Sequence, residues 1–114
     1  MAILEKSGDF DSKTLFRMMN GKCEKLRECV GDTVDIVGYA IIEQKNTDGE
    51  ETEILYLAFN DGRIAATSSP TVRRTFEAMV TAFGAPTDET PLVNVVIVEA
   101  ESKKGRNFLD IDFA

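Results

Sequence analysis

Two neighbouring segments in the first half of the chain are rich in apolar residues. Residues 33–45, "TVDIVGYAIIEQK", are rich in β-branched side chains, and Gly38 in the middle predicts a long strand with a bend or bulge. Residues 52–59, "TEILYLAF", predict a second strand, in which Leu55, Leu57 and Phe59 alternate with Ile54, Tyr56 and Ala58. The Asp48-Gly49 pair between the two segments is typical of a tight hairpin turn. A second turn signal, "NDG", precedes "RIAATS". We therefore predict three antiparallel strands in a meander.

The apolar spacing changes after these strands. Ser69 is a suitable N-cap, Pro70 suits the first helical position, and Gly84 is a suitable end. Between them, apolar residues recur at spacings of three and four: Val72, Phe76, Met79, Val80 and Phe83. This pattern predicts an amphipathic helix over residues 70–83, of about four turns.

Two further strands are predicted near the C-terminus. Residues 92–100, "LVNVVIVEA", are apolar on both faces, which indicates a buried strand. Residues 107–113, "NFLDIDF", alternate again, with Leu109, Ile111 and Phe113 on one face and Phe108, Asp110 and Asp112 on the other. The turn between these strands contains the basic segment "SKKGR".

The order strand, strand, strand, helix, strand, strand predicts a mainly β fold of the OB type. An OB-fold is a five-stranded Greek-key barrel, here with the helix between strands three and four. We expect a buried interior formed by alternate strand residues, with the helix closing one end of the barrel: Leu55, Leu57, Phe59, Leu109, Ile111, Phe113, Phe76, Val80 and Phe83. Residues 1–114 are predicted to form one domain, in which residues 1–32 are a helical and loop segment packed on the barrel.

Composition narrows the possible functions. The start of the chain lacks the features of a signal peptide, and no apolar run is long enough to span a bilayer, so we expect a cytoplasmic protein, in a host cell if it is viral. The chain contains no histidine, and Cys23 and Cys29 are its two cysteines. We predict reduced thiols without a catalytic role, and no metal, cofactor or membrane partner.

The chain has a formal net charge of −7, but three of its 13 lysines and arginines lie together in one short segment. The segment "AESKKGRNF" places Lys103, Lys104 and Arg106 around one glycine and ends at Phe108. In an OB-fold this segment is the loop between strands four and five, which commonly contacts oligonucleotides. Salt screens acidic residues beyond about 10 Å, so the local cations decide whether phosphates bind.

Strand alternation adds further candidates to this loop. If Leu55 points into the barrel, Tyr56 points outward, and continuing the same alternation along residues 33–45 places Tyr39 outward as well. The complete predicted nucleic-acid-binding set is Tyr39, Lys45, Tyr56, Arg63, Thr67, Lys103, Lys104, Arg106 and Phe108. Cations that follow the phosphates and rings on which bases stack are the mixture that single-stranded nucleic acid requires.

Other interpretations of these residues remain open. The basic turn could be a solvated hairpin tip, the tyrosines could pack across strands, and Arg73 could pair with Glu77 one turn on. Asp110 and Asp112, with Asp35 or Asp61, could hold Mg²⁺ in a nuclease, but no third ligand or general base follows from the spacing. We therefore predict no enzyme, and the main alternative function is a protein-interaction or structural module.

Two segments resemble a known protein family. The stretch "DGRIAATSSPTV", then a helix, then "VNVVIVEAESKKGRNF", is similar to the small single-stranded DNA-binding proteins of tailed bacteriophages, including phages with protein-primed replication. The similarity runs from about Thr33 to the C-terminus. Its matching positions are Asp61-Gly62, Ser69, Thr71 and the pattern Ser102-Lys104-Gly105-Phe108.

This resemblance implies an OB-fold protein that coats single-stranded DNA during phage replication without sequence specificity. It implies DNA contacts at Lys104 and Phe108, and partners that include other replication proteins, with the chain a monomer or a small homo-oligomer. The chain departs from the family where Ala65 replaces an aromatic residue expected on the third strand, and residues 1–32 match only loosely.

Overall fold

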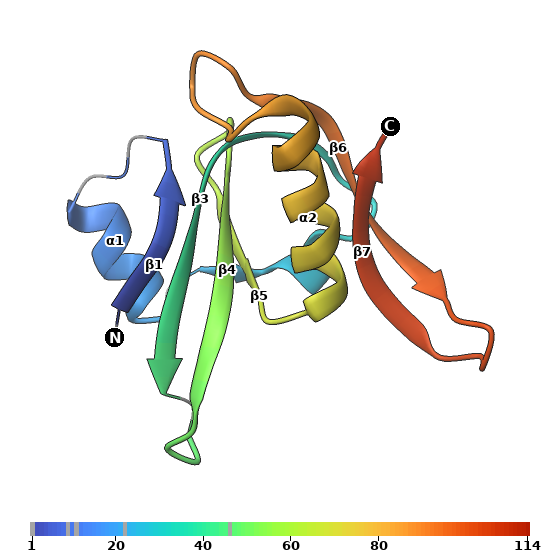
Figure 1. The fold of residues 1–114 in the computed structure, drawn as a ribbon, viewed down its shortest axis with the longest axis horizontal. Helices are drawn as coiled ribbons and strands as arrows, with labels where there is room; N and C mark the ends of the chain where they lie inside the picture. The colour runs from blue at the N-terminus through green and yellow to red at the C-terminus, as the bar shows by residue number, and fades with distance from the viewer. Residues whose placement is uncertain (1, 9, 11, 22, 46) are drawn as a thin grey trace.

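A curled, mostly antiparallel sheet forms the body of the molecule, and two α-helices pack on it (Figure 1). The computed structural model describes residues 2–8, 10, 12–21, 23–45 and 47–114. The elements are β1 (Ala2–Ser7), α1 (Ser12–Met19), β2 (Glu24–Lys25), the 3₁₀ helix η1 (Leu26–Cys29), β3 (Thr33–Lys45), β4 (Glu51–Phe59), β5 (Ile64–Thr67), α2 (Pro70–Phe83), β6 (Leu92–Glu101) and β7 (Asn107–Phe113).

The long strand β3 is the centre of the sheet. The strand order is β2-β5-β4-β3-β6-β7, and β1 pairs with β3 outside this path. One edge of β3 pairs with β4, from Ile36 to Lys45. The other edge is shared, because β6 pairs with residues 33–36 and β1 pairs with residues 39–43. Every other part of the sheet is therefore positioned by β3.

A bulge at Val37 and Gly38 divides β3 into these two halves. Ile36 lies opposite Phe59, but Gly38 lies opposite Ala58, so β3 contains one residue more than β4 at this point. An extra residue reverses the side-chain alternation on either side of it. The predicted bulge at Gly38 is confirmed.

Gly38 is required by the close approach of β1. A Cβ atom at Gly38 would lie 2.8 Å from the backbone oxygen of Ser7 and 3.1 Å from the Phe10 ring. On the facing segment, Gly8 has a φ of +86°, and a Cβ there would lie 2.8 Å from the Val37 oxygen. Two glycines thus allow the end of β1 to cross the bulge in backbone contact.

The sheet curls into a half-barrel and does not clearly form the predicted five-stranded, partly open OB barrel. Strands β3, β4, β5, β6 and β7 have the predicted order, and α2 lies between β5 and β6 along the chain. However, the ladders of the described residues include no pairing between β5 and β7. The free edge of β5 pairs instead in parallel with β2, Glu24 opposite Ala65 and Lys25 opposite Ala66. Ala65 and Ala66 on this edge of β5 are therefore occupied by β2.

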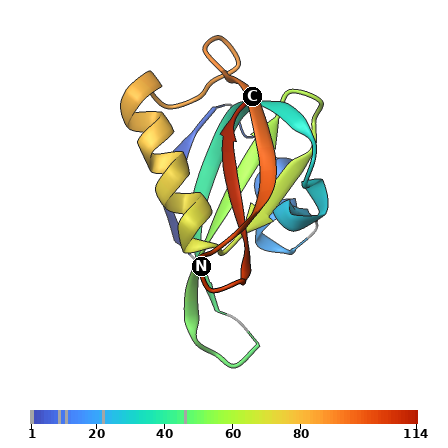
Figure 2. The same cartoon turned by 90° about the vertical axis from the view of Figure 1, so that its right-hand side faces the viewer.

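The helix α2 packs beside the open seam of the sheet (Figures 1 and 2). The predicted caps are confirmed: the Ser69 hydroxyl accepts a hydrogen bond from the Val72 amide at 3.3 Å, Pro70 opens the helix and Gly84 ends it. The Thr75 hydroxyl donates to Asp110 of β7 at 2.7 Å, and Arg73 pairs with Glu53 of β4 at 3.3 Å. The helix therefore connects the two sides of the curled sheet.

Two apolar clusters stabilise the fold. The concave side of the sheet and α2 enclose the larger cluster, which contains Leu55, Leu57, Phe59, Phe76, Leu109 and Ile111 as predicted. The smaller cluster lies on the outer face, where Met18 of α1 is buried with Ala40, Ile42 and Tyr56. None of the described helices is long and apolar enough to cross a membrane.

Two residues predicted to be buried are exposed instead. Phe83 is 70% exposed at the last position of α2, and Phe113 is 37% exposed at the last position of β7. Their rings contact each other edge to face with centroids 5.2 Å apart. Both predictions were wrong because the regular spacing of apolar residues continues to the last residue of each element, whereas the core does not extend that far.

The position of the core can be tested with two substitutions in α2. Phe76→Ala should lower the free energy of unfolding by about 3 to 5 kcal/mol, because this ring is 1% exposed. The matched control Phe83→Ala should lower it by about 1 kcal/mol or less. Urea denaturation of both variants measures the difference, and equal decreases would contradict this assignment of the core.

Candidate nucleic-acid interface

The hairpin of β6 and β7 extends away from the body of the molecule (Figure 1). Its turn is hydrogen-bonded: the Gly105 amide donates to the Ser102 carbonyl at 2.9 Å, and the Ser102 amide donates to the Arg106 carbonyl at 2.8 Å. Gly105 has a φ of +76°, a conformation that glycine adopts without steric cost. The sequence thus builds a defined turn that presents the neighbouring side chains.

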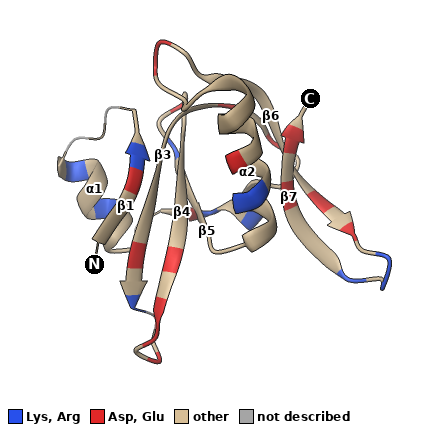
Figure 3. Cartoon of the chain, in the orientation of Figure 1, with Lys and Arg blue, Asp and Glu red and all other residues tan. Residues whose placement is uncertain are grey.

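This turn carries a group of exposed cations. Lys103, Lys104 and Arg106 are all exposed, and among the described residues none of the three forms an ion pair. Figure 3 shows them as the basic tip of the hairpin, with acidic residues behind them on the strands. The predicted cluster therefore exists as a surface feature, which we call the basic tip.

Phe108 lies next to the basic tip on the face of β7 opposite the core. Leu109 and Ile111 are buried in the larger cluster, whereas Phe108 is half-buried and belongs to neither cluster. Asp110, on the same face as Phe108, bonds to Thr75. The predicted alternation of side chains along β7 is thus confirmed up to Ile111. The Phe108 ring follows the basic tip by two residues in the sequence.

The predicted outward direction of Tyr39 is wrong. Tyr39 is 8% exposed in the larger cluster, and its ring contacts Phe76 edge to face with centroids 4.8 Å apart. The bulge explains the error: inward positions are Val34 and Ile36 before it, but Tyr39 and Ile41 after it. Continuing one alternation across the bulge reversed the face assigned to Tyr39.

Tyr56 points away from the larger cluster, as predicted, but it is covered. The ring is 3% exposed beneath α1, and its hydroxyl lies 2.8 Å from the Met18 carbonyl oxygen and 2.6 Å from Oε1 of Gln44. Burial raises the pKa of this hydroxyl. Neither tyrosine therefore offers a ring to solvent in this structure.

Arg63 is held by carboxylates rather than free. Its guanidinium contacts Asp61 at 2.7 Å, Asp32 at 3.2 Å and Glu24 at 3.7 Å, and lies over the Phe59 ring at 5.5 Å. The hydrogen bonds to Asp61 and Asp32 raise the pKa of Arg63. Three acidic neighbours leave no net positive field at this position.

Two other predicted residues lie apart from the basic tip. Lys45 is exposed at the end of β3 and faces Glu51 across the β3–β4 hairpin, whose tip is acidic in Figure 3. The Thr67 hydroxyl at the end of β5 accepts a hydrogen bond from the Ser69 amide at 3.1 Å. The structure therefore brings together Lys103, Lys104, Arg106 and Phe108, but not the remaining candidates.

The aspartates considered as metal ligands have protein partners. Asp35 accepts from the Asn94 amide, Asp61 binds Arg63, and Asp110 binds Thr75. Within the described ranges, no group of three or more potential ligands could hold a metal ion. Cys23 and Cys29 are free thiols. The pKa of the Cys29 thiol is raised to about 11, mainly because the thiol is buried and also because it bonds to the Glu24 carboxylate. A thiol with this pKa is a poor nucleophile at neutral pH.

Comparisons with protein-family models, with curated proteins and with solved structures find no match to this chain.

The buried role of Tyr56 can be tested by removing its hydroxyl. Tyr56→Phe should lower the free energy of unfolding by about 1 to 2 kcal/mol, because the buried hydroxyl contacts to the Met18 carbonyl and to Gln44 are lost. Tyr39→Phe is the control, because its hydroxyl bonds to the exposed Glu5 at a long 3.4 Å, and this substitution should lower the free energy of unfolding by less than about 0.5 kcal/mol. Urea denaturation checks both values, and an unchanged Tyr56→Phe stability would contradict the described burial.

Proposed function

We propose that this chain is a non-catalytic protein that binds single-stranded DNA without sequence preference, through the basic tip and Phe108. The observation that carries the proposal is the group of three exposed cations, without ion pairs among the described residues, on a protruding hairpin beside a half-buried aromatic ring. The cations contact phosphates, and the ring stacks on a base, which requires no particular sequence.

The distribution of charge supports this proposal despite the net charge of −7. The acidic residues nearest the basic tip lie along the strands, where Glu99 and Glu101 of β6 and Asp112 of β7 are exposed. Figure 3 shows the turn as a basic segment with acidic segments behind it on the strands, and the Glu101 carboxylate lies 3.7 Å from the position of a Cβ at Gly105. A flexible single strand can approach the tip without lying along the acidic strands.

The strand order also supports the proposal. The arrangement β5-β4-β3-β6-β7, with α2 between β5 and β6 along the chain, has the order of an OB-fold whose closing pair is missing. We interpret the fold as an open OB-type barrel in which the basic tip is the loop between strands four and five. Together with the resemblance to phage proteins, this favours a role in coating single strands during phage replication.

A protein-interaction module is the second candidate function. The exposed pair of Phe83 and Phe113 favours it, since large aromatic side chains are enriched at protein interfaces. This pair lies at the end of β7 opposite the basic tip. If the unmodified chain does not bind oligo(dT) even at low salt, the second candidate is favoured and the first is wrong.

The role of the basic tip can be tested with a triple substitution. Replacing Lys103, Lys104 and Arg106 with alanine should make the plot of log affinity for oligo(dT) against log salt shallower, by about 0.7 for each phosphate that is no longer neutralised. The matched control replaces Lys6, Lys13 and Arg17, which removes the same charge from β1 and α1. Fluorescence titration at several salt concentrations measures both slopes, and equal changes in the two variants would contradict a specific role for the tip.

Stacking on Phe108 can be separated from charge attraction. Phe108→Ala should weaken oligo(dT) binding by about 1 to 3 kcal/mol and leave the salt slope unchanged, because a ring releases no counterions. Phe83→Ala is the control, since this exposed ring of α2 contacts Phe113 at the end of β7 away from the basic tip. Normal binding by Phe108→Ala, with a decrease in stability typical of a core residue, would show that the ring serves packing alone.

A further inference from the structure

A cavity of about 510 Å³ opens at the seam where the sheet does not close. Lys25 of β2 and Arg27 of η1 line one part of it, and Thr67, Ser68 and Ser69 line another. Ile54, Ala66 and Leu109 complete the lining. We call this cavity the seam groove. It combines cations, hydroxyl groups and an apolar surface in a space large enough for part of a polymeric ligand.

The charge of the seam groove differs from that of the whole chain. Two of its lining residues are cations and, among the residues the structure describes, none is acidic, although the chain has a net charge of −7. Lys25 and Arg27 are exposed and form no ion pair within the described part of the chain. An adjoining hollow that shares Thr67 to Ser69 contains Arg73, but there Glu53 and Glu77 pair with the cation.

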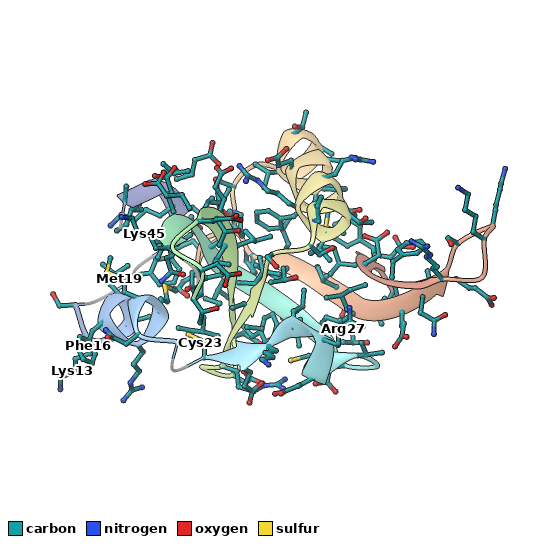
Figure 4. The ribbon with its side chains drawn as sticks, turned by 90° about the horizontal axis from the view of Figure 1, so that it is seen from below. Lys13, Phe16, Met19, Cys23, Arg27 and Lys45 are labelled. Atoms are coloured by element: carbon teal, nitrogen blue, oxygen red, sulfur yellow. The ribbon has the colours of Figure 1, made fainter. Side chains whose placement is uncertain are left out.

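The seam groove and the proposed binding surface share strand β7, with Leu109 on its core face and Phe108 on its other face. Leu109 lines the groove, and Phe108 and Asn107 separate it from Arg106 of the basic tip. At about 3.3 Å per strand residue, the three steps from Arg106 to Leu109 span about 10 Å. Figure 4, which views the molecule from below, shows Arg27 on the side of η1 that faces β7.

We infer that the seam groove binds the continuation of the same nucleic-acid strand, with Lys25 and Arg27 contacting its phosphates. The inference rests on the proposed function and extends it, because it makes the binding site longer than the hairpin and adds residues outside the region that resembles phage proteins. The hydroxyls of Ser68 and Ser69 are further donors to phosphate oxygens, and the apolar residues contact sugars and bases.

The test compares two lengths of oligo(dT), about 5 and about 15 nucleotides, within the range of site sizes of OB-folds. The unmodified chain should bind the longer strand more tightly and with a steeper salt slope. In Lys25→Ala/Arg27→Ala this gain with length should disappear, and the slope for the longer strand should fall by about 1.4, corresponding to two phosphate contacts. The control Lys13→Ala/Arg17→Ala, on α1, should retain both the gain and the slope.

A second pair of variants adds charge instead of removing it. Ser68→Glu places a carboxylate in the seam groove, and Ala82→Glu places one at an exposed position near the end of α2. Ser68→Glu should abolish the gain with length, whereas Ala82→Glu should preserve it. Thermal unfolding of each variant confirms that the fold is intact.

The outcomes separate this inference from the proposed function. If the unmodified chain binds neither oligonucleotide, the proposed function and the inference are both wrong. If the longer strand binds and the basic tip is needed, but both groove variants behave like their controls, only the inference is overturned. If the longer strand loses its gain in affinity in the groove variants but not in their controls, the inference is supported.

Discussion

The bulge at Val37 and Gly38 determines how the rest of the molecule is arranged. It divides the edge of β3 between β6 and β1, and it changes which residues face the larger cluster. A side chain at Gly38 would meet the Ser7 backbone oxygen at 2.8 Å, so only glycine allows β1 to cross here. With β1 in place, α1 covers the outer face and buries Tyr56. The outward ring of Tyr56 is therefore not accessible to a ligand.

The open seam follows from the same arrangement. The segment before β3 supplies β2, which pairs with the free edge of β5, and the described ladders include no pair between β5 and β7. The larger cluster is then covered by α2, which is connected to β7 through Thr75 and to β4 through Arg73. The seam groove is the space that remains near the start of α2. An incomplete barrel thus provides both a protruding hairpin and a cavity lined by cations.

Local patterns were sufficient to predict the elements from β3 to β7, because each has a clear period and turn residues or caps at its ends. They could not predict β1 and β2, whose pairing depends on partners distant in the chain. The basic tip and the outward side of Phe108 were predicted, since a turn exposes its own residues. The burial of both tyrosines, the ion pairs of Arg63 and the groove residues Lys25 and Arg27 depend on tertiary contacts. For Lys25 and Arg27, the only signal in the sequence was the group of basic residues in "KCEKLRE".

The central claim is that single-stranded DNA binds at the basic tip and not at the tyrosines or the exposed phenylalanine pair. The most direct measurement is the change in backbone amide chemical shifts of the isotope-labelled chain on adding oligo(dT), with a duplex of equal length for comparison. We expect the largest changes at residues 102 to 108, and much smaller ones with duplex. Changes confined to the region of Phe83 and Phe113, or equal changes with both ligands, would contradict this account.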